Sequence, residues 1–284
     1  MKLARGAALI GCGMVGGSLM AALRAVGAVE RVVGYDRDAG NAAAARAHGH
    51  IDEVAADAAA AARGAELVVL AVPVRATAEV LAAIAGAVDD AQLVTDVGST
   101  KADVVAAAEA TLPDPARFCG SHPMAGNERS GPASAAEALF VGKLALLTPG
   151  ARTSEVAHAA CKTMWTAAGA RTRTMTAATH DRAMAWVSHL PHAAAFALAA
   201  SVGTVAEEVA GLSGGGFVDT TRIAASDATM WRDIFVANRA ALLEAIDAYT
   251  IELAALRRAV DGGDAAAIEA LVARARQGRA RVIR

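Results

Sequence analysis

A glycine-rich turn near the N-terminus constrains the fold of this chain more than any other feature of its sequence. The turn, Gly11-Cys12-Gly13-Met14-Val15-Gly16, lies between the apolar run 7–10 and a segment, 16–26, that we expect to be helical. In a strand–turn–helix unit, Gly11 permits the tight turn, Gly13 lets a pyrophosphate approach the backbone, and Gly16 lets the helix pack on the strand. The helix N-terminus also offers free N–H groups to phosphates. The turn therefore predicts a dinucleotide site formed by Gly11, Gly13, Met14, Val15 and Gly16.

Strand and helix signals alternate along the first half of the chain. Apolar runs typical of strands occupy residues 7–10, 32–36, 67–72, 93–97, 118–122 and 144–148. Helical segments are expected at 16–26, 41–48, 77–87 and 100–110, and long ones at 154–168, 179–208, 231–260 and 264–279. Such alternation predicts a parallel sheet covered on both faces. We predict an α/β fold: a Rossmann-type doubly wound parallel sheet in residues 1–150, followed by an all-α domain in residues 151–284.

The other cofactor candidates lie near the ends of the expected strands. Asp36 lies 20 residues after Gly16, where a carboxylate accepts hydrogen bonds from the adenosine ribose. It favours NAD, because a 2′-phosphate would meet like charge, whereas Arg37 could accept that phosphate and so leaves NADP open. The remaining candidates are Val72, Pro73, Asp96 and Gly98. A proline that merely ends a strand explains Pro73 equally well.

Composition excludes several classes of protein. A formal net charge of −2 gives no general electrostatic footprint for nucleic acid. The three cysteines form neither a CxxC pair nor a disulfide framework, so a reducing cytoplasm is the expected compartment. The uncharged stretch 183–206 is long enough to span a bilayer, but it contains two histidines and a proline, which favour a buried helix. We expect no membrane partner.

Four further segments together are more specific than the glycine turn. They are VGSTK at 97–101, GSHPMAG at 120–126, SHLPH at 188–192, and GGGF followed by TTRIA at 214–224. With these motifs the sequence resembles the prephenate/arogenate (cyclohexadienyl) dehydrogenase family over essentially the whole chain. The resemblance implies oxidative decarboxylation of prephenate to 4-hydroxyphenylpyruvate with hydride transfer to NAD, in tyrosine biosynthesis and without a metal. Arogenate, or both substrates, remain alternatives.

His122 is the candidate general base. It lies at the end of an expected strand, and an imidazole with a pKa of about 6.5 can accept a proton near neutrality. Without its flanking motif, a packed and satisfied histidine would be the simpler interpretation. The resemblance implies that His122 hydrogen-bonds the substrate 4-hydroxyl and that Ser99 supports this contact.

Arg222 is the candidate for binding a substrate carboxylate, because a guanidinium offers a planar, permanently charged fork. A surface salt bridge is the alternative. Asp219, three residues earlier, could orient Arg222 or cap a helix. The resemblance supports the substrate role of Arg222.

Histidines supply further candidates for the substrate site. His189 and His192 are three residues apart and share one face of a helix, but no carboxylate accompanies them in a metal-binding pattern. The resemblance implies that His192 faces the substrate and that His180 lies in the same pocket. It also implies that Glu128 gates the pocket and helps to bind substrate. His189 fits core packing as well as it fits the site.

The helical half is rich in alanine and leucine, so it would expose apolar faces as a monomer. A two-fold homodimer through the C-terminal helices is the ordinary solution, and the resemblance implies the same. A β-hydroxyacid dehydrogenase is a competing interpretation, but residues 179–208 lack the lysine that such enzymes typically use. A non-catalytic dinucleotide-sensing protein would not need His122, Ser99 and Arg222 together.

Overall fold

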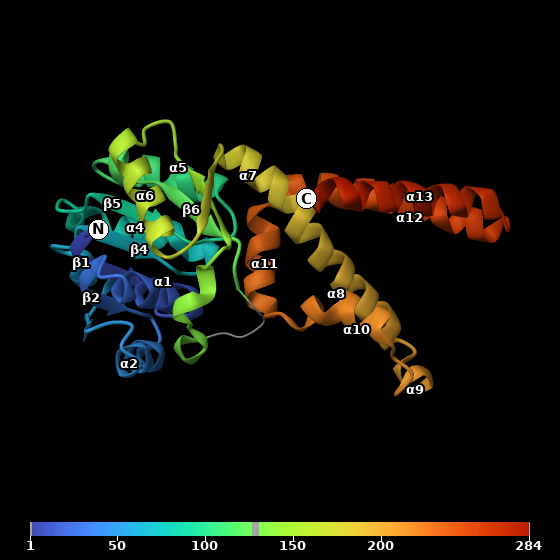
Figure 1. Cartoon of the computed structure of the whole chain (residues 1–284), viewed down its shortest axis with the longest axis horizontal. Helices are drawn as coiled ribbons and strands as arrows, with labels where there is room; N and C mark the ends of the chain where they lie inside the picture. The colour runs from blue at the N-terminus through green and yellow to red at the C-terminus, as the bar shows by residue number, and fades with distance from the viewer. Residues whose placement is uncertain (1, 127–130, 284) are drawn as a thin grey trace. The chain divides into compact units, whose positions relative to one another are not determined.

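A five-stranded parallel sheet forms the centre of the first half of the chain (Figure 1). The computed structural model describes residues 2–126 and 131–283, which cluster into a unit ending at Asn238 and a unit beginning at Arg239. The sheet has the order β3-β2-β1-β4-β5. Its strands are β1 (Ala4–Ile10), β2 (Val29–Tyr35), β3 (Glu53–Val54), β4 (Leu67–Leu70) and β5 (Leu93–Asp96). The strand β3 is not predicted from the sequence, because it has only two residues and both are exposed.

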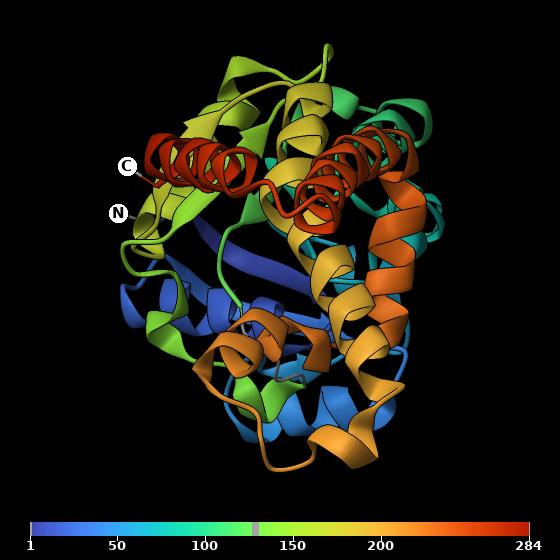
Figure 2. The ribbon, with the colours of Figure 1, turned by 90° about the vertical axis from the view of Figure 1, so that its right-hand side faces the viewer.

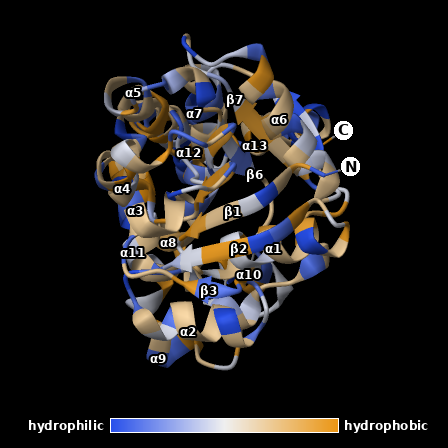
Figure 3. Ribbon diagram, turned by 90° about the vertical axis from the view of Figure 1, so that its left-hand side faces the viewer, coloured by the Kyte–Doolittle hydropathy of each residue, from blue (hydrophilic) through white to orange (hydrophobic). Residues whose placement is uncertain are grey.

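Helices cover both faces of this sheet. They are α1 (Met14–Ala25), α2 (Ala39–Ala47), α3 (Ala58–Ala62), α4 (Thr77–Ile84) and α5 (Ala102–Thr111). Neighbouring residues of β1 point to opposite faces, so that Leu9 packs in one core cluster with Leu23 of α1, and Ile10 in another with Leu81 of α4. Figure 3 shows the hydrophobic colours of β1 in the middle of the sheet. The predicted doubly wound parallel sheet is confirmed.

A second, smaller sheet follows in the same unit. It contains β6 (Gly120–Pro123), β7 (Leu144–Thr148) and β8 (Arg171–Thr174), with α6 (Glu155–Ala167) between β7 and β8. The strands β6 and β7 are antiparallel, whereas β7 and β8 are parallel. The prediction of helix alone after residue 151 is wrong at β8, whose sequence RTRT has no apolar face. The domain boundary near residue 150 stays a prediction, and β7 pairs with β8 across it.

The rest of the first unit is helical. It contains α7 (Ala177–Met184), a π-helical turn (Ala185–His189), α8 (Leu190–Gly203), α9 (Ala206–Val209), α10 (Gly215–Thr221) and α11 (Ala228–Ala237). The helix predicted over 179–208 is therefore interrupted, first by the π turn and then after Gly203. Figure 2 shows α8 with α10 beside it, and α8 also contacts the 3-10 turn Arg222–Ala225. Other 3-10 turns are Val74–Ala76, Ala85–Ala87, Pro115–Arg117, Pro132–Ser134 and Glu137–Phe140.

The second unit is a pair of helices, α12 (Arg239–Asp261) and α13 (Ala265–Val282). They are joined at Gly262-Gly263, where Gly263 has a φ of 61°. The prediction of one helix over 231–260 is wrong in one respect, because α11 ends at Ala237 and α12 begins at Arg239. Within the described part of the chain, no helix has the length and apolar character needed to cross a bilayer.

Candidate active site

The glycine turn combines two tight positions with one open position. Gly11 has a φ of 94°, and a Cβ there would lie 2.3 Å from the carbonyl oxygen of Ala71. A Cβ on Gly16 would lie 2.7 Å from both Gly11 O and Leu9 Cδ1. At Gly13, in contrast, no described atom lies within 4 Å of such a Cβ, and no described side chain caps the start of α1. The turn thus leaves open space in front of a helix N-terminus, as a phosphate site requires.

Asp36 ties this turn to the end of β2. Its Oδ2 accepts a hydrogen bond from Cys12 N at 2.8 Å, and its Oδ1 accepts one from Asp38 N at 2.9 Å. The side chain is half-buried, and Arg37 beside it is exposed. The predicted cofactor residues of the turn are therefore brought together with Asp36. After β4, Val72 is half-buried and Pro73 is exposed.

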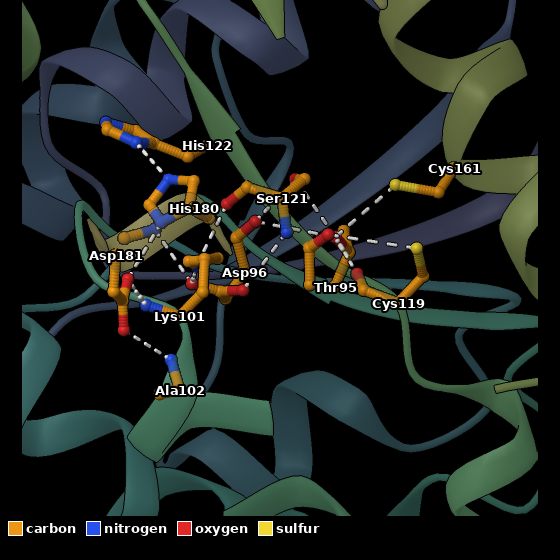
Figure 4. Close-up of polar contacts among 12 residues, drawn as sticks. Thr95, Asp96, Lys101, Ala102, Cys119, Ser121, His122, Cys161, His180 and Asp181 are labelled. Carbon is orange, nitrogen blue, oxygen red and sulfur yellow. Dashed lines mark hydrogen bonds and ion pairs between the residues drawn. The ribbon is translucent and has the colours of Figure 1, made fainter. Parts of the chain in front are cut away.

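A buried ion pair anchors the loop between β5 and α5. Lys101 is 0% exposed, and its Nζ pairs with Asp96 Oδ2 and donates to Ser121 O at 3.0 Å. Asp96 also accepts a hydrogen bond from Ser121 N (Figure 4). A further one comes from Gly98 N. The loop that carries Ser99, itself half-buried, is thereby fixed against β6, which carries His122. The cofactor role predicted for Asp96 stays a prediction. In the structure, its carboxylate contacts protein groups, namely Lys101 Nζ and two backbone N–H groups.

His122 begins a chain of three side chains that ends at a helix N-terminus (Figure 4). Its Nδ1 lies 2.9 Å from His180 Nε2, and His180 Nδ1 lies 2.8 Å from Asp181 Oδ1. Lys101 N and Ala102 N, at the start of α5, each donate to Asp181 at 2.8 Å. Residues from β6, α7 and the start of α5 thus meet at one point, and two of the predicted site residues, His122 and His180, are in direct contact.

The surroundings of His122 keep it neutral. Burial lowers its pKa well below the ordinary value, and the neighbouring His180, Lys101 and His189 lower it further. Burial would raise the pKa of Asp181, but the hydrogen bonds from His180, Ala102 N and Lys101 N outweigh burial and lower it. The chain therefore joins a neutral imidazole to an ionised carboxylate.

His189 lies in the π-helical turn and is 1% exposed. Asn238 Nδ2 lies 3.0 Å from its Nδ1 and donates to the backbone oxygen of Asp181 at 2.7 Å. Burial lowers the pKa of His189 to about 4, against the raising effect of Asp181. His189 is therefore a neutral neighbour of the His122 chain. Its predicted contact with substrate stays a prediction.

His192 and Arg222 form the second part of the candidate site. The His192 ring stacks on Trp231 with a centroid distance of 3.6 Å, and His189 meets the same indole edge-on. Burial lowers the pKa of His192, and the Arg222 guanidinium lowers it further, which places a positive charge near this ring. Arg222 and Asp219 are exposed, and Glu128 falls among residues 127–130, outside the described residues. Among the described residues, no group of three or more metal-ligating side chains is brought together.

The sequence predictions omit three residues that organise the site: Lys101, Asp181 and Asn238. Asp181 adjoins His180 in the sequence, and Lys101 ends the VGSTK motif, so the position of each residue could have indicated a role in the site. Nothing in the sequence indicated Asn238, because only the fold brings it beside Asp181 and His189.

Comparisons with known proteins agree with these features. Residues 19–174 match the family model "Prephenate dehydrogenase, nucleotide-binding domain", and residues 176–274 match "Prephenate dehydrogenase, dimerization domain". The chain is 35% identical over 261 residues to a prephenate dehydrogenase of Bacillus subtilis, covering 90% of this chain and 70% of that protein. It is 36% identical to a cyclohexadienyl dehydrogenase of Zymomonas mobilis, covering 90% of this chain and 89% of that protein.

Solved structures give the same result. Prephenate dehydrogenase from Aquifex aeolicus, in complex with hydroxyphenyl propionate and NAD+, superimposes with a TM-score of 0.88 at 32% identity, covering 98% of each chain. Arogenate dehydrogenase from Synechocystis superimposes with a TM-score of 0.81 at 26% identity, covering 98% of this chain and 100% of that one. The chain belongs to the prephenate dehydrogenase family.

Proposed function

We propose that this protein oxidatively decarboxylates prephenate to 4-hydroxyphenylpyruvate, with NAD as the hydride acceptor, as a step of tyrosine biosynthesis. The observation that carries the proposal is the buried, neutral His122, linked to His180 and Asp181, in a chain that belongs to this family. A general base with a depressed pKa suits removal of a hydroxyl proton at neutral pH.

The residues present fit a dinucleotide. The glycine turn leaves open space at Gly13, no described side chain caps the N-terminus of α1, and the carboxylate of Asp36 lies at the end of β2. Gly11, Gly13, Met14, Val15 and Gly16 would hold the pyrophosphate, Asp36 and Arg37 would face the ribose, and Val72, Pro73, Asp96 and Gly98 would line the rest. When bound, NAD supplies the acceptor for the hydride that leaves C4 of the substrate.

His122 has the central chemical role. Its imidazole accepts the proton of the 4-hydroxyl as hydride leaves C4, with Ser99 supporting this contact. As the ring carboxylate leaves as carbon dioxide, the electron pair of the broken C–C bond completes the aromatic ring. The proton returns from His122 to the oxygen, which becomes the phenolic hydroxyl of the product. Aromatisation makes the step downhill, so positioning and proton transfer are the main tasks of the protein.

Anion recognition is assigned to the second part of the site. Arg222 would bind a substrate carboxylate through its planar fork, with Asp219 orienting it. His192 lies near this charge, and His180, His189 and Glu128 would complete the pocket. We further infer a homodimer, because exposed apolar side chains such as Ile251 and Leu253 on α12 would be buried by a second copy. Cys12, Cys119 and Cys161 are buried free thiols, which fits a reducing cytoplasm.

Arogenate is the second candidate substrate, because relatives of this chain are named both prephenate and arogenate dehydrogenases. The decisive experiment gives the purified protein prephenate or arogenate with NAD or NADP, and follows the absorbance of the reduced cofactor. We expect turnover with prephenate and NAD. Turnover with arogenate but not with prephenate would identify arogenate as the substrate. No turnover in any of the four mixtures, from a folded protein that binds NAD, would contradict the proposed function.

A methyl group at Gly13 tests the cofactor site. The backbone there is extended, with φ −80° and ψ −169°, so alanine is accommodated without strain. We expect Gly13→Ala to change the free energy of unfolding by less than about 1 kcal/mol. Its methyl group would enter the space of the pyrophosphate, so the Kd for NAD should rise by about tenfold or more.

Gly16→Ala is the matched control for Gly13→Ala, and urea denaturation and calorimetric titration with NAD report on both variants. The Cβ at position 16 would clash with Leu9 and Gly11, so this variant should lose about 1–3 kcal/mol of stability. Unchanged NAD affinity in Gly13→Ala would place the cofactor elsewhere.

A further inference from the structure

Asp181 is a buried carboxylate that the proposed chemistry does not use. It is 6% exposed, and three N–H donors converge on it: Lys101 N, Ala102 N and His180 Nδ1. The two backbone donors open α5, a helix of ten residues, whose N-terminus favours negative charge. Burying a charged carboxylate costs free energy. In return, its negative charge can determine which nitrogen atoms of the neighbouring histidines carry protons.

The ionised carboxylate determines which nitrogen of His180 carries the proton. A carboxylate accepts hydrogen bonds and donates none, so His180 Nδ1 must carry a hydrogen. When the His180 ring carries a single proton, on Nδ1, its Nε2 is bare and can only accept. Because His122 Nδ1 lies 2.9 Å from this atom, His122 must donate from Nδ1. The Nε2 atom of His122 is left with its lone pair.

We propose that Asp181 is a positioning residue that, acting through His180, holds His122 in the tautomer whose Nε2 is the general base. The inference rests on the proposed function for its catalytic consequence, but the tautomer itself is a property of the free protein. Without the charge of Asp181, His180 could carry its proton on Nε2 and donate to His122 Nδ1. His122 would then carry its own proton on Nε2, where it could not accept one from a hydroxyl group.

Tautomer control matters here because His122 is neutral before the reaction. Its low pKa has its origin in burial and in the groups that face it, namely His180, Lys101 and His189. A neutral imidazole has two tautomers, and only one of them is a base at the nitrogen that faces away from His180. The protein must therefore select between them, and the described contacts of His122 provide one selecting partner, His180.

The backbone of Asp181 is also held. Asn238 Nδ2, at the end of α11, donates to the Asp181 carbonyl oxygen at 2.7 Å. Asp181 is therefore fixed from α5 through its side chain and from α11 through its main chain, which leaves the carboxylate little freedom to turn away from His180.

The first test reads the tautomer without turnover, by 15N NMR of the histidine side chains in the intact protein. The His122 signals are assigned by their loss in His122→Asn. We expect wild-type His122 to show a protonated Nδ1 and a bare Nε2, and Asp181→Asn to shift it towards the other tautomer. A wild-type His122 protonated on Nε2, or a tautomer unchanged in folded Asp181→Asn, would overturn the proposal, whether or not the protein acts on prephenate.

The second test separates positioning from general damage to the structure. We expect Asp181→Asn to lower kcat by about 10²-fold or more and to leave KM within a few fold of wild type. For comparison, a wrong histidine tautomer in a serine protease triad lowers kcat by ~10⁴-fold. In the His122→Asn background the same substitution should have no further effect, because Asp181 acts through that imidazole. Asp57→Asn is the matched control, since Asp57 also accepts a backbone N–H at a helix start, at Ala60, but is exposed.

Equal losses of kcat from Asp181→Asn in the two backgrounds would show a merely structural role and overturn the proposal. Failure of the proposed function has a different signature. Wild-type protein would then show no turnover of prephenate, while the tautomer measurement still decides the role of Asp181.

Discussion

Replacing His122 by asparagine should lower kcat by about 10²–10⁴-fold, the usual contribution of a positioned general base. The amide is close to the imidazole in size and can still hydrogen-bond, but it cannot accept a proton at any accessible pH. The glycine turn and Asp36 are untouched, so the Kd for NAD should stay within about twofold of wild type. Turnover is followed by the absorbance of reduced cofactor, and NAD binding by calorimetric titration.

The pH dependence gives this substitution a second readout. His122 is active as a base when neutral, and its pKa lies below the ordinary value, so wild-type kcat/KM should hold as pH falls through 6.5 and decline only at more acidic pH. That acidic limb should be missing from the residual activity of His122→Asn. The exposed His48 supplies the control, because His48→Asn should match wild type in both rate and profile. A kcat within threefold of wild type in His122→Asn would remove His122 from the catalytic role.

Replacing Lys101 by methionine should have the largest effect on stability, about 3–5 kcal/mol in the free energy of unfolding. The substitution preserves most of the side-chain length, but it leaves the Asp96 carboxylate, 1% exposed, without its cationic partner. It also removes the hydrogen bond to Ser121 O that joins the β5–α5 loop to β6. Urea denaturation followed by circular dichroism measures the loss.

Two further variants show whether the loss comes from the buried charge. Lys162→Met changes an exposed lysine on α6 and should cost less than about 0.5 kcal/mol. Combining Lys101→Met with Asp96→Asn removes both charges, so the double variant should be more stable than Lys101→Met alone. A loss below about 1 kcal/mol for Lys101→Met, or a double variant less stable than the single one, would contradict this account of the ion pair.

The parts of the fold that the sequence predicts well are those whose residues are buried on both faces. The strands β1, β4, β5 and β7 each contain consecutive buried apolar residues, and the glycine turn fixes where α1 begins. The strand β8 fails this rule, because RTRT is partly or fully exposed and gains its place by pairing with β7. The interruption of the long helix at Ala185–His189 has no breaker in the sequence; Pro191 follows it, at the start of α8.

The site divides in the same way. His122, His189 and His192 lie in the quoted motifs, and His180 follows from the family resemblance. The structure joins His122, His180 and Asp181 to His189, Trp231 and His192 through Asn238. The burial of Lys101 was not predictable, since a lysine is ordinarily expected at the surface. Nor could sequence spacing assign a partner to Asp181, because its backbone donors lie some 80 residues away in α5. Those long-range partners determine how the chemistry is organised.

The central claim is that one substrate molecule loses both a hydride and a carboxylate at this site. The most direct measurement uses prephenate labelled with carbon-14 in its ring carboxylate, and compares released carbon dioxide with reduced NAD in the same reaction. The account predicts equal amounts of the two products with wild-type protein, and loss of both together in His122→Asn. Carbon dioxide released without reduced NAD, or reduced NAD formed without carbon dioxide, would contradict it.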